Sequence, residues 1–454
     1  MAAGVPVRHT VENPPPNPLT PQPTSSFEKA VYAKATRRII PFLFLCYVFA
    51  YIDRVNIGFA KLQMQANIGI SDAVYGFGAG IFFLGYFLFE IPCNLMLQRI
   101  GAKRWLGPIM IIWGVVSGCQ MFITGPATLY GIRFLLGVVE SGFFPGVILY
   151  LTFWYPRKYR AKMIAAFMTA VPLSGVFGGP ISGWILGAMS HVEGLHGWQW
   201  LFVFEAIPSI VAGVLTTYFL DDGPQTAKWL KEDERSLLLQ RLREEEELKR
   251  AETPGHSSLA DAFRSPKVWA LCFIYFGTVM VNYGISFWLP QIVKDTLSKN
   301  VFHIGLLTAI PWAAAAIAMV VVGHHSDKTG ERRWHIAGPA IVCSIAFALS
   351  ALPGVPGPVG LLLLTLATAG IASAYSTFWA LPATILSGTA ASAGIAWVNS
   401  VGNLAGYLSP YLVGVIRDKS HSMFWALLML SFCGLFSAVL TLLCFHPRTS
   451  QPRS

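Results

Sequence analysis

Residues 39–60, IIPFLFLCYVFAYIDRVNIGFA, form an apolar run that is interrupted by an acid and a base, Asp53 and Arg54. The run is long enough to cross the hydrocarbon core of a bilayer as an α-helix, which takes about 20 residues. An unpaired charge in hydrocarbon costs several kcal/mol, so charged residues inside a span face the protein interior and usually serve a function. We therefore expect a transmembrane helix whose two charges point inward.

The composition extends this interpretation to the whole chain. Of the 454 residues, 54% are hydrophobic and 12% are charged, against about 25% charged in an ordinary soluble domain. The net charge is +10, but the basic residues stand in short clusters between apolar blocks, a distribution that belongs to membrane topology. We expect a lipid bilayer around the protein and no nucleic acid as a partner.

Twelve candidate transmembrane helices follow one another in two sets of six. The first set lies near residues 39–60, 75–97, 105–123, 128–150, 162–188 and 200–220, and the second near 268–291, 303–323, 335–352, 359–386, 391–416 and 423–445. This pattern predicts an all-α membrane protein of two six-helix bundles. Its parts would be a disordered N-terminal tail (1–38), the first bundle (39–220), a polar cytoplasmic linker (221–267), the second bundle (268–445) and a C-terminal tail (446–454).

The distribution of lysine and arginine predicts the orientation. The connections QRIGAKRW, YPRKYRAKM and SDKTGERRW are strongly basic, whereas the alternate connections ITGPATLY and LPGVPGPVG carry no basic residue. The connection IRDKSHS is an exception. Because basic loops remain in the cytoplasm, both termini are expected there.

A repeated motif supports the two halves. NLMLQRIGAKR (94–104) follows the second predicted helix, and GHHSDKTGERR (323–333) follows the eighth. The motif resembles the signature of the major facilitator superfamily, G-x-x-x-D-[RK]-x-G-[RK]-[RK]. The second copy fits with one extra residue, and the first departs, with Asn94 and Gln98 in place of glycine and aspartate. The resemblance implies two pseudo-symmetric bundles around a central path, with a cytoplasmic gate formed by Arg99, Gly101, Asp327, Lys328, Gly330, Arg332 and Arg333.

Charges within the predicted spans are concentrated in the first half. Arg133 and Glu140 are seven residues apart, nearly two helical turns, so they lie on one face about 10 Å apart along the axis. Asp53 and Arg54 project about 100° apart on their helix. Two guanidinium groups suggest an anion site, and buried acids can carry protons. The alternative, that these are static ion pairs that pin helices together, stays open.

Four stretches together resemble the anion:cation symporter family of that superfamily: YIDRVNIGFA, YFLFEIPCNLMLQRIGAKRW, RFLLGVVESGFFPG and FWLPQI. The bacterial members include proton-coupled importers of sugar acids, tartrate and aromatic acids. The resemblance implies that Arg54 and Arg133 bind the substrate and that Asp53 and Glu140 carry protons. It also favours the inner membrane of a bacterium.

Other polar and aromatic residues are candidates for the lining of the site: Tyr51, Tyr86, Asn282, Tyr283, Trp288, Ser376, Asn399 and Asn403. The aromatic residues could equally belong to interfacial belts, and the asparagines could join helices. For Glu90 and Glu205, near the ends of spans, we expect a structural role, such as pairing with loop arginines. The glycines of SGVFGGPISG are expected to allow close helix packing.

These features predict a secondary active transporter, with proton-coupled uptake of a small organic anion such as a sugar acid, tartrate or an aromatic carboxylate. An efflux antiporter or a facilitator on the same fold is the alternative. A membrane enzyme would need a motif such as HExxH, which the sequence lacks. GHHSD is better explained as a gate turn than as a metal site. We expect no cofactor and a monomer.

Overall fold

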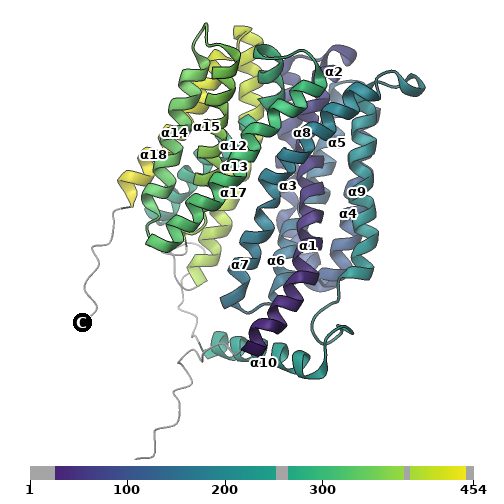
Figure 1. The fold of residues 1–454 in the computed structure, drawn as a ribbon, viewed down its shortest axis with the longest axis vertical. Coiled ribbons are helices and arrows are strands. Elements are labelled where there is room, and N and C mark those ends of the chain that lie inside the picture. Colours follow the sequence, from purple (N-terminus) through teal and green to yellow (C-terminus); the bar gives the residue numbers. More distant parts are fainter. Residues whose placement is uncertain (1–25, 252–263, 383–388, 446–454) are drawn as a thin grey trace, which may run out of the picture.

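The computed structural model describes residues 26–251, 264–382 and 389–445, and within these ranges every regular element is a helix. The first half of the chain and the second half form two neighbouring groups of helices (Figure 1). Eleven helical segments are long and apolar enough to cross a membrane. The helix α17 (Thr389–Ser420), which overlaps the predicted span at 391–416, completes twelve. The predicted all-α fold of two six-helix bundles is confirmed.

Several predicted spans of the first half are broken into two helices. The first span is α1 (Ser26–Val55) followed by α2 (Ile57–Ile68), with the break at Asn56. The remaining helices of this half are α3 (Asp72–Ile100), α4 (Ala102–Gly118) with the short η1 (Cys119–Phe122), α5 (Pro126–Glu140), α6 (Phe143–Thr152), α7 (Arg157–Met168), α8 (Ala170–Ala188), η2 (Val192–Gly194) and α9 (Gly197–Phe219).

The second half has long, mostly continuous helices. Besides α17 they are α12 (Pro266–Thr296), α13 (Val301–Thr329), α14 (Arg333–Ala351), α15 (Gly357–Phe378) and α18 (Phe424–Cys444). The tenth span was predicted over 359–386, but α15 ends at Phe378, and residues 383–388 lie outside the described residues.

The predicted disordered tail over residues 1–38 is too long. The helix α1 begins at Ser26, so residues 26–38 are helical. Val31, Tyr32 and Ala35 are buried against the bundle, while polar residues lie between them. Such a segment is not a continuous apolar run, so its sequence does not resemble a membrane span. Residues 1–25 and 446–454, the rest of the two predicted tails, lie outside the described residues.

The predicted linker contains an amphipathic helix, α10 (Glu232–Ala251), that lies across one end of the first half (Figure 1). Ion pairs hold it there: Lys34 to Glu234 at 2.6 Å, Arg241 to Glu28 at 2.8 Å and Arg160 to Glu245 at 3.1 Å. The hydrogen bond from Lys34 holds the pKa of the Glu234 carboxyl below its usual value. We call this end of the molecule the α10 end, and the opposite end the far end.

Two seams of close packing join the halves, α3 against α17 and α8 against α13. A Cβ on Gly80 would lie 2.4 Å from the carbonyl oxygen of Tyr407, and one on Gly179 would lie 2.7 Å from that of Gly305. Only glycine allows this approach, since real Cβ contacts are longer. The expectation that the SGVFGGPISG glycines allow close packing is confirmed at this position.

Candidate substrate and proton site

Arg54 lies at the centre of a buried cluster between the two halves. Asp53, the neighbour of Arg54, is fifteen residues from Arg38 and fifteen residues from the end of α2. The cluster therefore lies near the middle of the first span, at about half the depth of the membrane. The Arg54 guanidinium donates through Nε to Glu140 Oε1 at 3.0 Å and through Nη2 to the same oxygen. Its Nη1 donates to the Tyr283 hydroxyl of α12 at 3.1 Å. Arg54 therefore joins the first half to the second.

Arg133, on α5, is fully buried beside this pair. Its Nη2 donates to the backbone oxygens of Arg54 and Ala79, each at 3.3 Å. Its Nε and Nη1 have no hydrogen-bond partner among the described residues, and neither does Oε2 of Glu140. A buried charged donor without a partner is costly, so the arrangement has unused capacity to bind an anion.

Aromatic rings surround the two arginines. The Arg54 guanidinium carbon is 5.5 Å from the centre of the Tyr51 ring, 5.3 Å from Phe82 and 5.8 Å from Tyr86. Such contacts stabilise a desolvated guanidinium by roughly 2 kcal/mol. Three of the predicted lining residues, Tyr51, Tyr86 and Tyr283, thus lie around Arg54. Phe82 was not predicted, because phenylalanine is common in membrane spans and does not stand out in the sequence.

Asp53 faces away from Arg54, into the interior of the first half. Its carboxylate accepts hydrogen bonds from Trp113 Nε1 at 2.8 Å, Ser117 Oγ at 3.0 Å and Ser209 Oγ at 2.5 Å. The alternative that Asp53 and Arg54 form a static ion pair therefore does not hold in this conformation. Neighbouring residues on a helix diverge by about 100°, and the packing of α1 turns only Arg54 toward the second half.

A second buried acid lies near Asp53. Glu205 is one turn before Ser209 on α9, so both reach α1 from the same face of their helix. The Glu205 carboxylate accepts a hydrogen bond from Ser182 Oγ at 2.6 Å. Its partner is therefore a serine of α8 and not a loop arginine, which was the expected example of a structural role.

A small cavity of about 20 Å³ lies where α1 and α2 meet α8, α12 and α13. Its walls include the polar residues Tyr51, Asn56, Ser182 and Ser286. A space of this size with several polar partners is suited to one water molecule. Such a water would lie between the Arg54 cluster and the Glu205 region.

Among the described residues, the predicted lining residues Asn399, Asn403 and Ser376 bond to partners other than Arg54 and Arg133. Asn399 and Asn403 of α17 donate to the Glu90 carboxylate of α3, at 3.1 and 3.3 Å. This acid therefore joins the two halves, with asparagines as its partners in place of loop arginines. Ser376 donates to the backbone of its own helix at 3.0 Å. Asn282 is buried on α12, one residue before Tyr283.

Trp288 belongs to a charged network at the far end, which we call the far-end network. The Lys61 ammonium lies 4.4 Å from the centre of the Trp288 ring and 2.8 Å from Asp72 Oδ1. Arg417 of α17 bridges Asp72 at 2.9 Å and Asp295 of α12 at 2.8 Å. These contacts tie α2 and α3 to α12 and α17, so the halves are closed together at the far end.

Sequence reasoning missed most of this network. Lys61 stands in the apolar stretch IGFAKLQM, where a charge could have been noticed, and Arg417 lies in IRDKSHS, the loop that broke the topology rule. Of the two basic residues that made this connection exceptional, Arg417 pairs across the far end, whereas Lys419 is exposed.

The predicted cytoplasmic gate forms two separate turns at the α10 end. In the second half Asp327 pairs with Arg332 at 2.6 Å, and Arg333 donates to the Leu442 carbonyl. Gly101 and Gly330 have φ values of +90° and +69°, a conformation that favours glycine. Arg99 and Lys328 have no ion-pair partner among the described residues, and Arg99 is exposed.

Removal of the far-end arginine should loosen that end. In Arg417→Gln, we expect about tenfold faster hydrogen exchange, or roughly 1.4 kcal/mol, at the amides of Asp72 and Ala73. These amides now donate to Asp418 at 2.9 and 2.7 Å, and the contact depends on α17 staying against α3. Lys419→Gln, an exposed change two residues away, is the control. Equal exchange in all three proteins would show that the network does not hold this end closed.

Charged side chains buried at mid-depth between two helical bundles, with one end sealed by ion pairs, are the features of a membrane transporter. The sequence profile described as Major Facilitator Superfamily matches residues 43–410. The chain belongs to the major facilitator superfamily. It is therefore a multi-pass membrane transporter and not an enzyme, as the sequence predicted.

Relatives of known name agree with this assignment. A Pseudomonas putida protein named as a metabolite transport protein, NicT, is 48% identical, over 92% of this chain and 93% of its own. An Agrobacterium vitis protein named as a tartrate transporter is 44% identical, over 92% of this chain and 92% of its own. An Acinetobacter baumannii protein named as a quinolone resistance transporter is 37% identical over 92% of this chain and 96% of its own.

Solved structures share the fold. A bacterial homologue of the human lysosomal transporter Spinster, in an inward-facing and occupied conformation, matches with a TM-score of 0.73 at 16% identity. The match covers 89% of this chain and 96% of that one.

Proposed function

We propose that this transporter carries a small organic anion together with protons, in the uptake direction, and works as a monomer. The observation that carries the proposal is the buried Arg133, whose Nε and Nη1 lack partners, beside the Arg54–Glu140 pair. Two guanidinium groups and one carboxylate leave a net positive site. A substrate carboxylate can accept bidentate hydrogen bonds from such a group.

Glu140 is the proton carrier that responds most directly to the substrate. Its Oε1 is held by Arg54. A carboxylate that binds Arg54 would take that place, and a buried acid that has lost its guanidinium favours the protonated, uncharged form. Substrate binding and proton uptake would thereby occur together.

Asp53 is proposed as the second proton carrier. Its three donors, Trp113, Ser117 and Ser209, hold it in the first half behind Arg54. Glu205 and the small polar cavity offer a route by which a proton could reach it. A monocarboxylate that moves with two protons enters as a net cation, so an inside-negative potential assists uptake by about 2.3 kcal/mol per 100 mV.

The substrate class is tested by a thermal-shift screen of the purified protein against sugar acids, tartrate, aromatic carboxylates and quinolones. The relative named as a tartrate transporter supports an organic acid, and we expect the acids to raise the melting temperature of this protein. The relative named as a quinolone resistance transporter is the observation that favours the alternative, efflux. Stabilisation by quinolones alone would replace our proposal with that alternative.

We further propose that the α10 end lies in the cytoplasm of a bacterial cell, with the protein in the inner membrane. The basic turns around Arg99, Arg157 and Arg332 all gather at that end. A fluorescent protein fused after Ser454 should fluoresce, and an alkaline phosphatase fused there should be inactive. The reverse pair of results would invert the orientation.

A further inference from the structure

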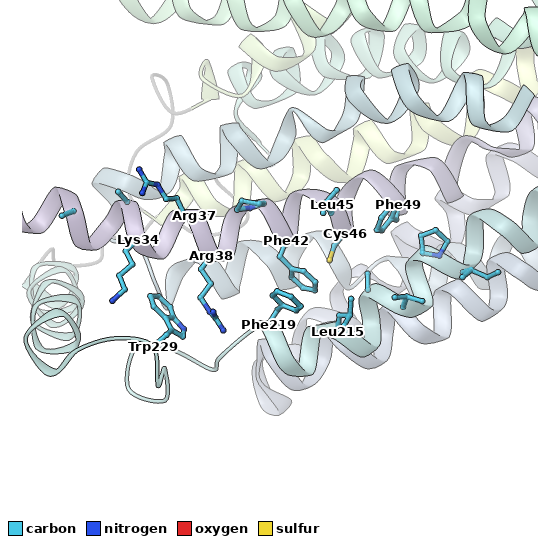
Figure 2. Close-up of a pocket in the computed structure, with 17 residues that line it drawn as sticks. Lys34, Arg37, Arg38, Phe42, Leu45, Cys46, Phe49, Leu215, Phe219 and Trp229 are labelled. Carbon is cyan, nitrogen blue, oxygen red and sulfur yellow. The ribbon is translucent and has the colours of Figure 1, made fainter. Parts of the chain in front are cut away.

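A long groove runs along the outer surface between α1 and α9, at the α10 end (Figure 2). Its volume is about 1190 Å³. Its walls are mainly apolar side chains that the bundle leaves exposed or half-buried: Phe42, Leu45, Phe49, Ile207, Val211, Leu215 and Phe219. It lies on the outside of the first half, apart from the buried cluster around Arg54.

Basic side chains line one end of this groove. Figure 2 shows Lys34 and Arg38 on the same side of α1 as Trp229, while Arg37 leaves the helix on another side. The Lys34 ammonium is paired with Glu234 at 2.6 Å. Arg38 lies 5.4 Å from the centre of the Trp229 ring, and neither Arg37 nor Arg38 has a carboxylate partner within the described part of the chain. This end of the groove therefore carries positive charge that is not neutralised.

The length of the groove fits one leaflet of a bilayer. Eleven residues of α1 separate Arg38 from Phe49, which is about 16 Å at 1.5 Å per residue. Half of the hydrocarbon core is about 15 Å thick. With Arg38 and Trp229 at the polar interface, where tryptophan is commonly found, the apolar walls extend through the hydrocarbon of that leaflet.

We infer that this groove binds one anionic phospholipid of the surrounding membrane. The phosphate would lie against Arg38, with Arg37 adding charge at the rim, and an acyl chain would pack along Phe42, Leu45 and Phe219. Basic pockets between transmembrane helices are suited to such head groups. A free small anion would leave the long apolar wall uncovered, and a zwitterionic lipid would leave the arginines without a net counter-charge.

The test is native mass spectrometry of the purified protein with equal amounts of phosphatidylglycerol and phosphatidylcholine that carry identical acyl chains. The wild-type protein should retain phosphatidylglycerol in preference. Arg38→Gln should lower the ratio of the two adducts about fivefold, and Arg37→Gln with Arg38→Gln roughly 25-fold, because each basic residue near a membrane surface contributes about 1 kcal/mol. Val211→Trp, which fills the half-exposed wall, should lower the retention of both lipids.

Lys103→Gln with Arg104→Gln removes two charges from the start of α4, away from the groove, and should leave the ratio unchanged. Three results would overturn the inference: equal retention of the two lipids by the wild-type protein, an unchanged ratio in the Arg37 and Arg38 variants, or an equal loss in the control. The assay requires no organic substrate, so its outcome is separate from that of the proposed transport.

Discussion

Arg133→Lys is expected to abolish measurable binding of the proposed organic-anion substrate. The ammonium keeps the positive charge but lacks the fork of donors that a carboxylate can accept bidentately. It would also be unable to keep the contacts to the backbone oxygens of Arg54 and Ala79 while reaching the substrate. The loss of both charge-assisted hydrogen bonds of the fork, at roughly 1.5–3 kcal/mol each, predicts affinity at least about 100-fold weaker, measured by calorimetry with the acid that the screen selects.

Arg54→Lys should have an effect of the same size, since it removes the partner of both Glu140 and Tyr283. Arg104→Lys, at an exposed position at the start of α4, is the matched control and should bind as the wild-type protein does. Circular dichroism and the melting temperature check that each variant is folded. If both buried variants bind within twofold of the wild-type protein, the arginines are structural.

Glu140→Gln and Asp53→Asn should separate binding from coupling. Each amide resembles the protonated acid and cannot release a proton. We expect both variants to lose accumulation of substrate in proteoliposomes with an imposed pH gradient and potential, by at least about tenfold. Counterflow, with substrate on both sides of the membrane, should persist, because exchange requires no net movement of protons.

Glu193→Gln, an exposed change in η2, is the control for the loss of an acid and should accumulate substrate normally. Should both buried variants still concentrate substrate on a proton gradient, these acids only hold helices together. A loss of counterflow as well as accumulation would instead assign them to substrate binding.

The hydrogen bond between Arg54 and Tyr283 gives the proposed coupling a structural consequence. It is a polar contact at the centre of the cluster that crosses from α1 to α12. A substrate that binds the Arg54 guanidinium competes with the Tyr283 hydroxyl for it, and so weakens this hydrogen bond between the halves. The far-end network would then have to open for the site to face the other side of the membrane.

The fold and the members of the central cluster could be predicted because their signals are local. An apolar run of about 20 residues specifies a span, and a charge within it stands out: Arg54, Arg133 and Glu140 were found in this way, and they lie together. The pairing was harder to predict. Asp53 and Arg54 are adjacent in sequence, yet Asp53 faces away from the arginine and accepts hydrogen bonds from Trp113 of α4 and Ser209 of α9.

The far-end network was beyond prediction for a related reason. Asp72, Asp295 and Arg417 stand at the ends of spans, where charged residues are ordinary, and only the folded chain brings them together. Trp288 looked like a lining residue of the site because it follows Tyr283 in one motif. Five residues of helix place it about 7.5 Å farther along the axis, beside Lys61.

The most direct test of the proposed symport is a measurement of pH inside proteoliposomes that contain the wild-type protein. A pH-sensitive dye is trapped inside, the potential is clamped, and the organic acid found in the screen is added outside. Our account predicts that the interior becomes more acidic as labelled substrate enters. In Glu140→Gln, this acidification should be lost. Entry of substrate without any change of internal pH, or with a rise of pH, would contradict proton-coupled symport.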